Sequence, residues 1–285
     1  MKRQAFRADG ALLAMTAFWG VSFVIVKEAL DHSDPFTFLA LRFVVAGLAC
    51  VMVARGQLFD RALWRPGAWL GLFLFLGFIF QTWGLVTTTP SRSAFITSLF
   101  VVFVPLVQWG LLRRRPGLAA VAGALLAIGG AWVLSGASFG GGFTSGDWLT
   151  LGSAAAYSVQ IVLTGHWAAR LDPVPLVSLE VLVVAVLACA TAPFGPRQVE
   201  PVPGFVGAVI AMGVIATALG IWVQTWAQAR TTSVRAALII ALEPVFATAW
   251  SIFRGREPFD PKVLLGGGLI LSGVVVSELF KRRDA

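Results

Sequence analysis

The chain has 285 residues, of which 58% are hydrophobic and 13% are charged, and its net charge is +8. A soluble domain carries about 25% charged residues, because solvated groups must cover its surface. This composition excludes a soluble enzyme, a disordered chain and a secreted domain held by disulfides. It indicates an integral membrane protein, and the predicted fold class is all-α, since long apolar segments cross a bilayer as helices.

Ten apolar segments run along the chain, and each has the length of about 20 residues that a membrane-spanning helix needs. Prolines mark several of their starts, as expected at the first turn of a helix. The other residues fill short loops and two tails, which leaves no room for a soluble domain. We expect helices over residues 11–30, 35–54, 67–87, 92–112, 117–135, 148–168, 174–192, 203–228, 233–253 and 261–280.

Basic residues at the ends of these segments predict the orientation. Fourteen of them lie in the two tails and the even-numbered connections, and five lie in the odd-numbered connections. Lysine and arginine accumulate on the cytoplasmic side of membrane proteins, so we expect both termini to be cytoplasmic. Arg254, Arg256 and Lys262 depart from this rule. The first apolar run lacks a small-residue cleavage site, so it is expected to persist as the first helix.

An internal repeat divides the ten segments into two sets of five. At an offset of 138, Asp34-Pro35 aligns with Asp172-Pro173. At an offset of 143, residues 81–103 align with residues 224–246 and share eleven identities in 23 positions. Chance would give about two identities, and self-similarity of this kind identifies repeat architectures.

The odd number of helices in each repeat makes the second copy enter the membrane from the opposite face. The predicted domains are a first five-helix repeat over residues 1–136, a Gly/Ser-rich periplasmic linker over 137–147 and a second, inverted repeat over 148–285. Inverted repeats are common in secondary transporters, which bind their substrate near the bilayer midplane at the repeat interface. The architecture therefore predicts alternating access to a central site.

The chain resembles the drug/metabolite transporter superfamily, and more narrowly its EamA-type bacterial exporters, which include amino-acid exporters. The resemblance rests on the two five-helix repeats, on Phe18-Trp19-Gly20, and on Leu242-Glu243-Pro244-Val245 followed by Gly255-Arg256-Glu257-Pro258. The first repeat departs from the pattern, because Phe100-Val101 replaces the Glu-Pro pair and proline follows only at Pro105. The resemblance implies a transporter of the bacterial inner membrane and leaves its cargo open.

Motifs of membrane enzymes are absent from the sequence. His32 and His166 are far apart and form no His-Glu-x-x-His zinc motif, and no Walker motif occurs. Cys50 and Cys189 lie in apolar runs and have no disulfide or metal-binding pattern. We therefore expect no enzyme activity, no cofactor, no metal and no nucleic-acid partner. The expected partners are the bilayer, a small-molecule substrate and, as a candidate coupling ion, a proton.

Large aromatic and polar side chains recur on the predicted helices other than the fifth and tenth, whose small residues indicate close packing. Several are spaced by three residues and so share a helix face. We expect a substrate cavity among them, while the alternative is that the polar groups only bond helix to helix. The predicted cavity residues are Trp19, Phe23, Phe78, Gln81, Phe95, Ser98, Tyr157, Gln160, Trp222, Gln224 and Glu243.

Five further charges are candidates for gating or coupling: Lys27, Arg42, Glu180, Arg92 and Arg235. Arg42 and Glu180 occupy equivalent positions with opposite sign, and a charge at mid-helix costs about 3 kcal/mol in lipid. Each is therefore expected either to be satisfied locally or to act in gating, with the Glu180 carboxyl as the better candidate for carrying a proton.

Lysine and arginine at helix ends have a plainer interpretation. Lys27 is expected either to snorkel to the interface or to stand at the mouth of the cavity beside Trp19 and Phe23, which share its helix face. Arg92 and Arg235 open two helices, where a cation opposes the helix dipole. They either anchor the helices to lipid headgroups, or they lie at the two mouths of the cavity, one on each membrane face, and attract a carboxylate.

Aromatic surfaces with few charges suit a small zwitterion that has an apolar side chain. We therefore predict a secondary active or facilitative exporter of small metabolites, with amino acids as the favoured cargo. The alternatives are a translocator for drugs, sugars, nucleotide-linked sugars or lipid carriers, and a structural membrane protein without transport activity. A doubly anionic sugar nucleotide would need several inward cations, and the helix cores offer few.

Overall fold

The fold is described from a computed structural model that covers residues 2–55, 57–113, 117–135, 144–196, 198–256, 258–259 and 261, with residues 265–276 in part. Within this part of the chain the protein is helical, and the pairing of Ser33 with Val199 is an isolated β-bridge outside any strand. The all-α prediction is confirmed for these residues. Residues 137–143 of the predicted linker 137–147 and residues 277–280 of the predicted helix 261–280 lie outside them.

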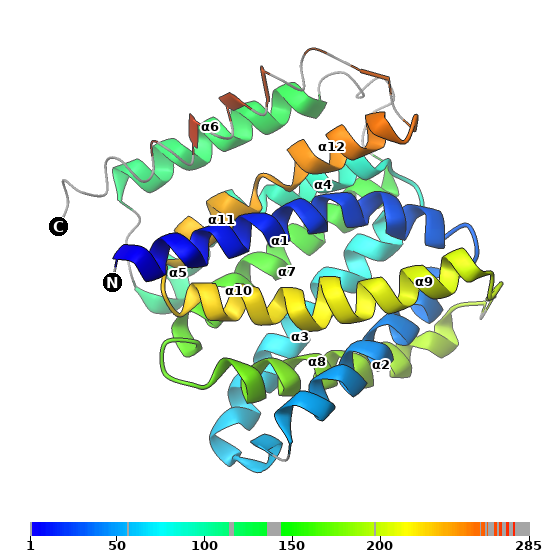
Figure 1. The fold of residues 1–285 in the computed structure, drawn as a ribbon. Helices are drawn as coiled ribbons and strands as arrows, with labels where there is room; N and C mark the ends of the chain where they lie inside the picture. The colour runs from blue at the N-terminus through cyan, green and yellow to red at the C-terminus, as the bar shows by residue number, and fades with distance from the viewer. Residues whose placement is uncertain are drawn as a thin grey trace.

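The described residues between 2 and 253 form twelve α-helices, and Figure 1 shows them as a bundle. Short 3-10 turns, η1 and η2, follow α2 and α8 at Gln57–Phe59 and Ala192–Phe194, and a π-helical segment, η3 (Met212–Leu219), joins α9 to α10. The helices are α1 Lys2–Ala29, α2 Pro35–Ala54, α3 Arg61–Gly84, α4 Pro90–Ser98, α5 Phe100–Leu112, α6 Leu118–Ser135, α7 Ser145–Trp167, α8 Pro173–Thr191, α9 Pro203–Ala211, α10 Gly220–Gln228, α11 Ser233–Ile240 and α12 Glu243–Phe253.

Nine of the ten predicted segments fall on these helices, and most of the tenth, 261–280, lies outside the described residues. Seven helical stretches in the described part are long and apolar enough to cross a membrane, and α6 contains a shorter apolar stretch, Val121–Gly130. The long helix α7 is not among the seven, and it carries several hydroxyl and amide side chains. The structure thus describes a multi-pass membrane protein, and the number of ten spans stays a prediction.

Polar residues and prolines fix the starts of the helices. The carboxylates of Asp34 and Asp172 accept hydrogen bonds from the first backbone N–H groups of α2 and α8, and a proline follows each aspartate. The hydroxyls of Thr89 and Thr232 cap α4 and α11 in the same way. Side-chain acceptors at this position satisfy donors that have no partner within the helix. Both pairs of caps fall at equivalent positions of the two predicted repeats.

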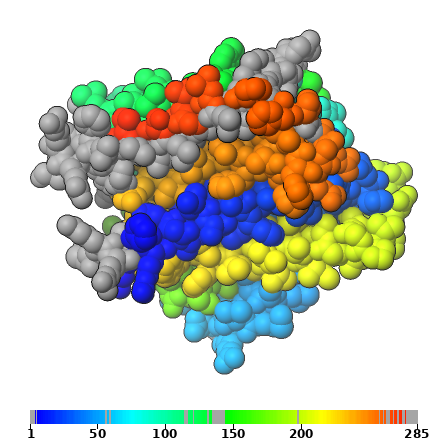
Figure 2. Space-filling model, turned by 45° about the horizontal axis from the view of Figure 1, so that its top comes forward, coloured from blue at the N-terminus to red at the C-terminus, as the bar shows by residue number. Residues whose placement is uncertain are grey.

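Helices from the two halves of the chain interleave. Helix α3 packs against α7 and α8, α2 packs against α8, and α1 packs against α12. On the face seen in Figure 2, α1 (blue) lies between the α9–α10 segment (yellow) and residues 233–253 (orange). Each half therefore supplies walls to a common interior, which is where a central site can form.

Two long segments are interrupted at the same place. The segment 90–112 breaks between Ser98 and Phe100, and the segment 233–253 breaks between Ile240 and Glu243. The breaks coincide under the offset of 143, and both lie near the middle of their segments. An interrupted helix exposes backbone dipoles at mid-membrane, and transporters use such ends to hold polar substrates.

Candidate functional site

A cavity occupies the middle of the bundle, and side chains from both halves of the chain line it. Its space is about 700 Å³, including the part open to solvent. The lining consists of Trp19, Ser22, Phe23, Val26, Arg42, Leu74, Phe78, Gln81, Thr82, Leu85, Thr97, Phe100, Tyr157, Gln160, Ile161, Ile221, Gln224, Ile240 and Glu243.

Eight of the eleven predicted cavity residues are in this lining, and Arg42, expected as a gate, joins them. The other three lie elsewhere. Phe95 packs with Ile96 and Leu242 in a separate apolar cluster, and the hydroxyl of Ser98 donates to the Phe95 carbonyl. Trp222 stacks on Trp226, with ring centroids 6.3 Å apart. The neighbouring Thr97 lines the cavity instead, so the helix face that looks inward is one residue away from the predicted one.

Trp19 and Tyr157, which align at the offset of 138, each cover a glycine of the other half. The Trp19 indole lies against Gly220, where an added Cβ would be 2.9 Å from Nε1, and that nitrogen donates to the Ala216 carbonyl at 2.8 Å. The Tyr157 ring lies against Gly77, where an added Cβ would be only 2.2 Å from the ring. Gly77 and Gly220 align at the offset of 143, so the two contacts are equivalent.

The cavity holds one arginine, and its guanidinium is fixed in place. The Nε atom of Arg42 donates to the Thr217 hydroxyl at 2.9 Å, and the guanidinium carbon lies 4.4 Å from the centre of the Phe78 ring. Contact with an aromatic face stabilises a desolvated cation. No hydrogen bond from the two terminal nitrogens to the described part of the chain is present, so these donors remain available to a ligand in the cavity.

Glu243 brings a carboxylate to the same cavity, at the first residue of α12. Its side chain makes no hydrogen bond or ion pair within the described residues, although the residue is only 6% exposed. Of the two roles that the sequence left open, capping of a kink or facing the cavity, the structure shows the second. A buried carboxylate without a partner is costly, so a ligand that supplies a cation or a hydrogen-bond donor would be stabilised there.

Glu180 lies behind the cavity wall and is connected to it by amides. Its Oε1 accepts a hydrogen bond from Gln160 at 2.8 Å, and Gln160 in turn accepts one from Gln224 at 3.0 Å. Gln224 also donates to Gln228 at 3.0 Å. Glu180 is fully buried, and its Oε2 has no hydrogen-bond partner in the described structure. Arg42 and Glu180 therefore have separate local partners despite their equivalent positions.

Lys27 is bonded to backbone carbonyls of the first half. Its ammonium group donates to the backbone carbonyls of Leu85 at 2.7 Å, Val86 at 2.9 Å and Thr88 at 3.2 Å. These carbonyls lie just after the end of α3, where the last backbone acceptors of a helix lack intrahelical partners. Lys27 therefore caps the C-terminal end of α3 and links it to α1.

The two arginines at helix starts have protein partners rather than only headgroups. Arg92 forms an ion pair with Asp147 at 2.8 Å, and Arg235 forms one with Asp9. These carboxylates offset the unfavourable position of a cation near a helix N-terminus. The sequence reasoning did not find the aspartates, although they align with each other at the offset of 138.

Comparison with known proteins identifies the family. The model of the EamA-like transporter family matches residues 7–136 and again residues 144–279. The chain belongs to the EamA-like transporter family. The resemblance found in the sequence is thereby confirmed, and membrane transport is the activity that the family name carries.

Relatives of this EamA-like transporter span nearly its whole length. An "uncharacterized transporter" of Archaeoglobus fulgidus is 33% identical, over 95% of this chain and 86% of the relative. A "probable terminal-alkyne amino-acid exporter" of Streptantibioticus cattleyicolor is 27% identical, over 98% and 97% of the two chains. The "uncharacterized inner membrane transporter YhbE" of Escherichia coli is 25% identical, over 99% of this chain and 94% of the relative. A solved crystal structure with a TM-score of 0.78 and 23% identity, which covers 95% of this chain and 96% of that one, shares the fold.

Proposed function

We propose that this EamA-like transporter exports small zwitterionic metabolites, with amino acids as the favoured cargo, across the bacterial cytoplasmic membrane by alternating access. The observation that carries this proposal is a cavity with one arginine, one carboxylate and aromatic walls. An α-carboxylate would bind the free nitrogens of Arg42, and an ammonium group would bind Glu243. The rings of Trp19, Phe23 and Phe78 would bury an apolar side chain.

The charge balance of the lining favours a zwitterion over the alternatives. A sugar nucleotide carries two negative charges, and Arg42 is the one cation among the lining residues. A neutral or cationic drug would leave Arg42 without a counter-charge, which is unfavourable in a desolvated site. The similarity to a probable amino-acid exporter supports the same substrate class.

The proposed architecture is two inverted five-helix repeats with both termini in the cytoplasm. The family model matches two consecutive stretches of similar length. The equivalent helix caps, the equivalent helix breaks and the equivalent contacts of Trp19 and Tyr157 add support, and the charge bias of the loops supports the orientation.

Replacing Gln81 with alanine tests the site. Gln81 accepts a hydrogen bond from Tyr157 at 3.4 Å and donates to Thr97 at 3.1 Å. In proteoliposomes with labelled amino acids, we expect KM to rise about fivefold, because one hydrogen bond contributes ~1 kcal/mol. Trp19→Ala is a poorer probe, since Trp19 also packs on Gly220 and would affect folding.

Gln108→Ala is the matched control, because Gln108 is an amide on α5 outside the lining. It should leave both transport and the melting temperature at the wild-type level. Equal KM values for Gln81→Ala and Gln108→Ala would place the substrate elsewhere. Transport of sugars or dyes with no transport of amino acids would replace the proposed substrate class.

Glu180 is proposed to couple transport to protons. A buried carboxyl can carry a proton in its neutral form, and the amides of Gln160 and Gln224 connect it to the cavity. We expect wild-type transport to vary with pH and Glu180→Gln to lose that variation, with a similar melting temperature. Glu200→Gln, in an exposed loop, is the control. A Glu180→Gln variant with the wild-type rate and pH profile would exclude coupling through this residue.

A further inference from the structure

Two ion pairs join the halves of the chain, and they are equivalent to each other. Arg92 and Arg235 align at the offset of 143, and Asp147 and Asp9 align at the offset of 138. Each pair takes its arginine from one half and its aspartate from the other, because Asp147 lies in α7, the first helix of the second half. The pattern is therefore reciprocal, since each half provides one cation and one carboxylate to the other.

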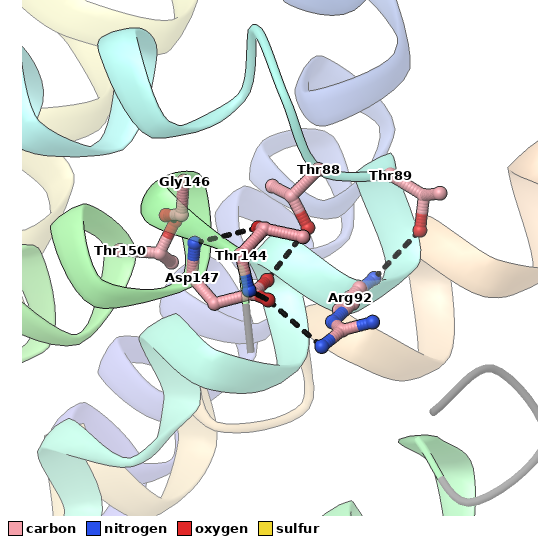
Figure 3. Close-up of polar contacts among 7 residues, drawn as sticks. All are labelled: Thr88, Thr89, Arg92, Thr144, Gly146, Asp147 and Thr150. Carbon is pink, nitrogen blue, oxygen red and sulfur yellow. Dashed lines mark hydrogen bonds and ion pairs between the residues drawn. The ribbon is translucent and has the colours of Figure 1, made fainter. Parts of the chain in front are cut away.

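The Arg92–Asp147 pair is formed and buried, and Figure 3 shows its contacts. The arginine side chain is 9% exposed and the aspartate is fully buried. Asp147 also accepts hydrogen bonds from the Thr88 hydroxyl at 3.0 Å and from the Thr144 backbone at 2.6 Å. The pair thus holds the starts of α4 and α7 and the α3–α4 connection together at one end of the bundle.

The Arg235–Asp9 pair is more exposed to solvent than the Arg92–Asp147 pair. Its arginine side chain is 31% exposed and its aspartate 15% exposed. It joins the start of α11 to the first part of α1. Water screens an exposed ion pair more strongly than a buried one, so the attraction between Arg235 and Asp9 is screened more than that between Arg92 and Asp147.

The two pairs lie at opposite ends of the bundle. Asp9 is near the start of α1, whereas Lys27, near its end, bonds to the carbonyls of Leu85 and Thr88 beside Arg92. At 1.5 Å per residue, Asp9 and Lys27 are about 27 Å apart along the helix axis. The cavity lies between these levels, and one ion pair stands on each side of it.

We propose that Arg92–Asp147 and Arg235–Asp9 are two locks that open in turn and expose the cavity to one side of the membrane at a time. The inference rests on the proposed alternating access, and it adds the residues that close each side. Opening a lock separates a cation from a carboxylate that belong to different halves, so it requires the halves to move apart at that end. With one lock broken, the conformation closed by the other lock gains population.

The end that holds Arg92 has additional restraints, which agrees with its tighter lock. Lys27 ties α1 to the end of α3, and Glu28 pairs with Arg254 and Arg256 at 3.0 and 3.1 Å. The position equivalent to Lys27 in the second half is Gly165, which has no side chain to do the same. Within the part of the chain that the structure describes, Lys27 and Glu28 therefore restrain the Arg92 end in addition to its ion pair.

Access to the cavity from each side tests the locks without any substrate. A background with Cys50→Ala and Cys189→Ala would carry one cavity cysteine, Ser22→Cys, since Ser22 lines the cavity. A membrane-impermeant thiol reagent is applied to either side of sealed proteoliposomes. Separate preparations with Glu200→Cys, at the Arg92 end, and Arg61→Cys, at the Asp9 end, report which end faces the reagent.

Arg92→Gln should raise labelling of the cavity cysteine about tenfold from the Arg92 end and lower it from the Asp9 end. Arg235→Gln should do the reverse. Arg92→Lys should retain the wild-type labelling, because it keeps the charge. Arg230→Gln, which removes a cation that stacks on Trp226 near the Asp9 end, is the control and should change nothing.

Several results would overturn the proposal. Labelling unchanged in both variants, or raised from the same side by both, would exclude alternating locks. If Arg92→Gln does not fold, a short bifunctional thiol reagent can join Arg92→Cys to Asp147→Cys instead. The joined protein should keep access from the Asp9 end and lose access from the Arg92 end; access from both ends would contradict the lock. If the protein does not transport amino acids but the labelling still changes on the expected sides, the substrate assignment is wrong and the proposal of two locks is retained.

Discussion

Glu243→Gln is expected to lower kcat/KM for zwitterionic amino acids about 100-fold, while carboxylates without an amine lose far less. Glutamine has the same shape as glutamate but cannot neutralise an ammonium group. A hydrogen bond to a charged partner contributes about 1.5–3 kcal/mol, and 100-fold corresponds to about 2.7 kcal/mol. Glu243 has no protein partner within the described residues, so the charge change should not break a contact of the fold.

Arg42→Gln should produce the reciprocal selectivity, with poor transport of carboxylates and a smaller loss for simple amines. The measurement is uptake into proteoliposomes of three labelled compounds of similar size: an amino acid, its deaminated acid and its decarboxylated amine. Glu200→Gln is the control for a charge change away from the cavity. If both cavity variants lose transport of all three compounds in equal proportion, the two charges do not bind opposite ends of the substrate.

Gly20→Ala should destabilise the protein by about 2–3 kcal/mol and abolish transport, although alanine is a better helix former than glycine. A Cβ at Gly20 would lie 2.6 Å from the Cβ of Phe246 and 2.7 Å from the carbonyl oxygen of Glu243. Overpacking of a close contact typically costs 1–3 kcal/mol. The contact is with backbone, so α1 and α12 would have to separate, and Glu243 would move with α12.

Gly10→Ala on the same helix is the matched control. Nothing lies within 4 Å of a Cβ at Gly10, so the only expected effect is a gain in helix propensity of up to ~1 kcal/mol. Thermal unfolding in detergent and transport in proteoliposomes measure both variants. A Gly20→Ala variant as stable as Gly10→Ala would mean that α1 and α12 do not pack as closely as described.

The sequence predicted the helices because the signals for them are local. Apolar length, the caps at Asp34 and Asp172, and the following prolines act within a few residues of one another. The helix breaks were foreseen less well. Pro244 explains the one before α12, but the break after Ser98 has no proline at its site.

The sequence predicted most of the residues that line the cavity, but it predicted only in part which face of each helix points inward. Spacing shows which side chains share a helix face, as with Phe95 and Ser98, but it does not show which face points inward. Thr97 and Phe100, also three residues apart, line the cavity instead. Trp222 and Gln224 are two residues apart and therefore point to different sides of α10. Ile221, three residues from Gln224, is the one that joins it in the lining.

Ion pairs between the halves are tertiary contacts, so no local signal marks them. Asp9 lies among charged residues near the N-terminus and Asp147 in a capping box, and each has an ordinary local explanation. Only their alignment under the repeat offset, together with that of Arg92 and Arg235, distinguishes them. Arg92 and Arg235 lie within the most similar stretch of the two halves, whereas Asp9 and Asp147 lie outside it.

The π-helical segment η3 contains more residues than an α-helix would need to cover the same turns. A π turn holds more residues than an α turn, and over the eight residues of η3 the difference amounts to about one residue. A helix with one residue fewer here would leave α10 in the same rotational phase, with Gln224 still facing inward. Such a helix would lose the wide turns that contain Ala216 and Thr217. The Ala216 carbonyl accepts a hydrogen bond from Trp19, and the Thr217 hydroxyl accepts one from Arg42. The segment thus behaves as a helix with one inserted residue. The hydrogen bonds that hold the Trp19 and Arg42 side chains depend on it.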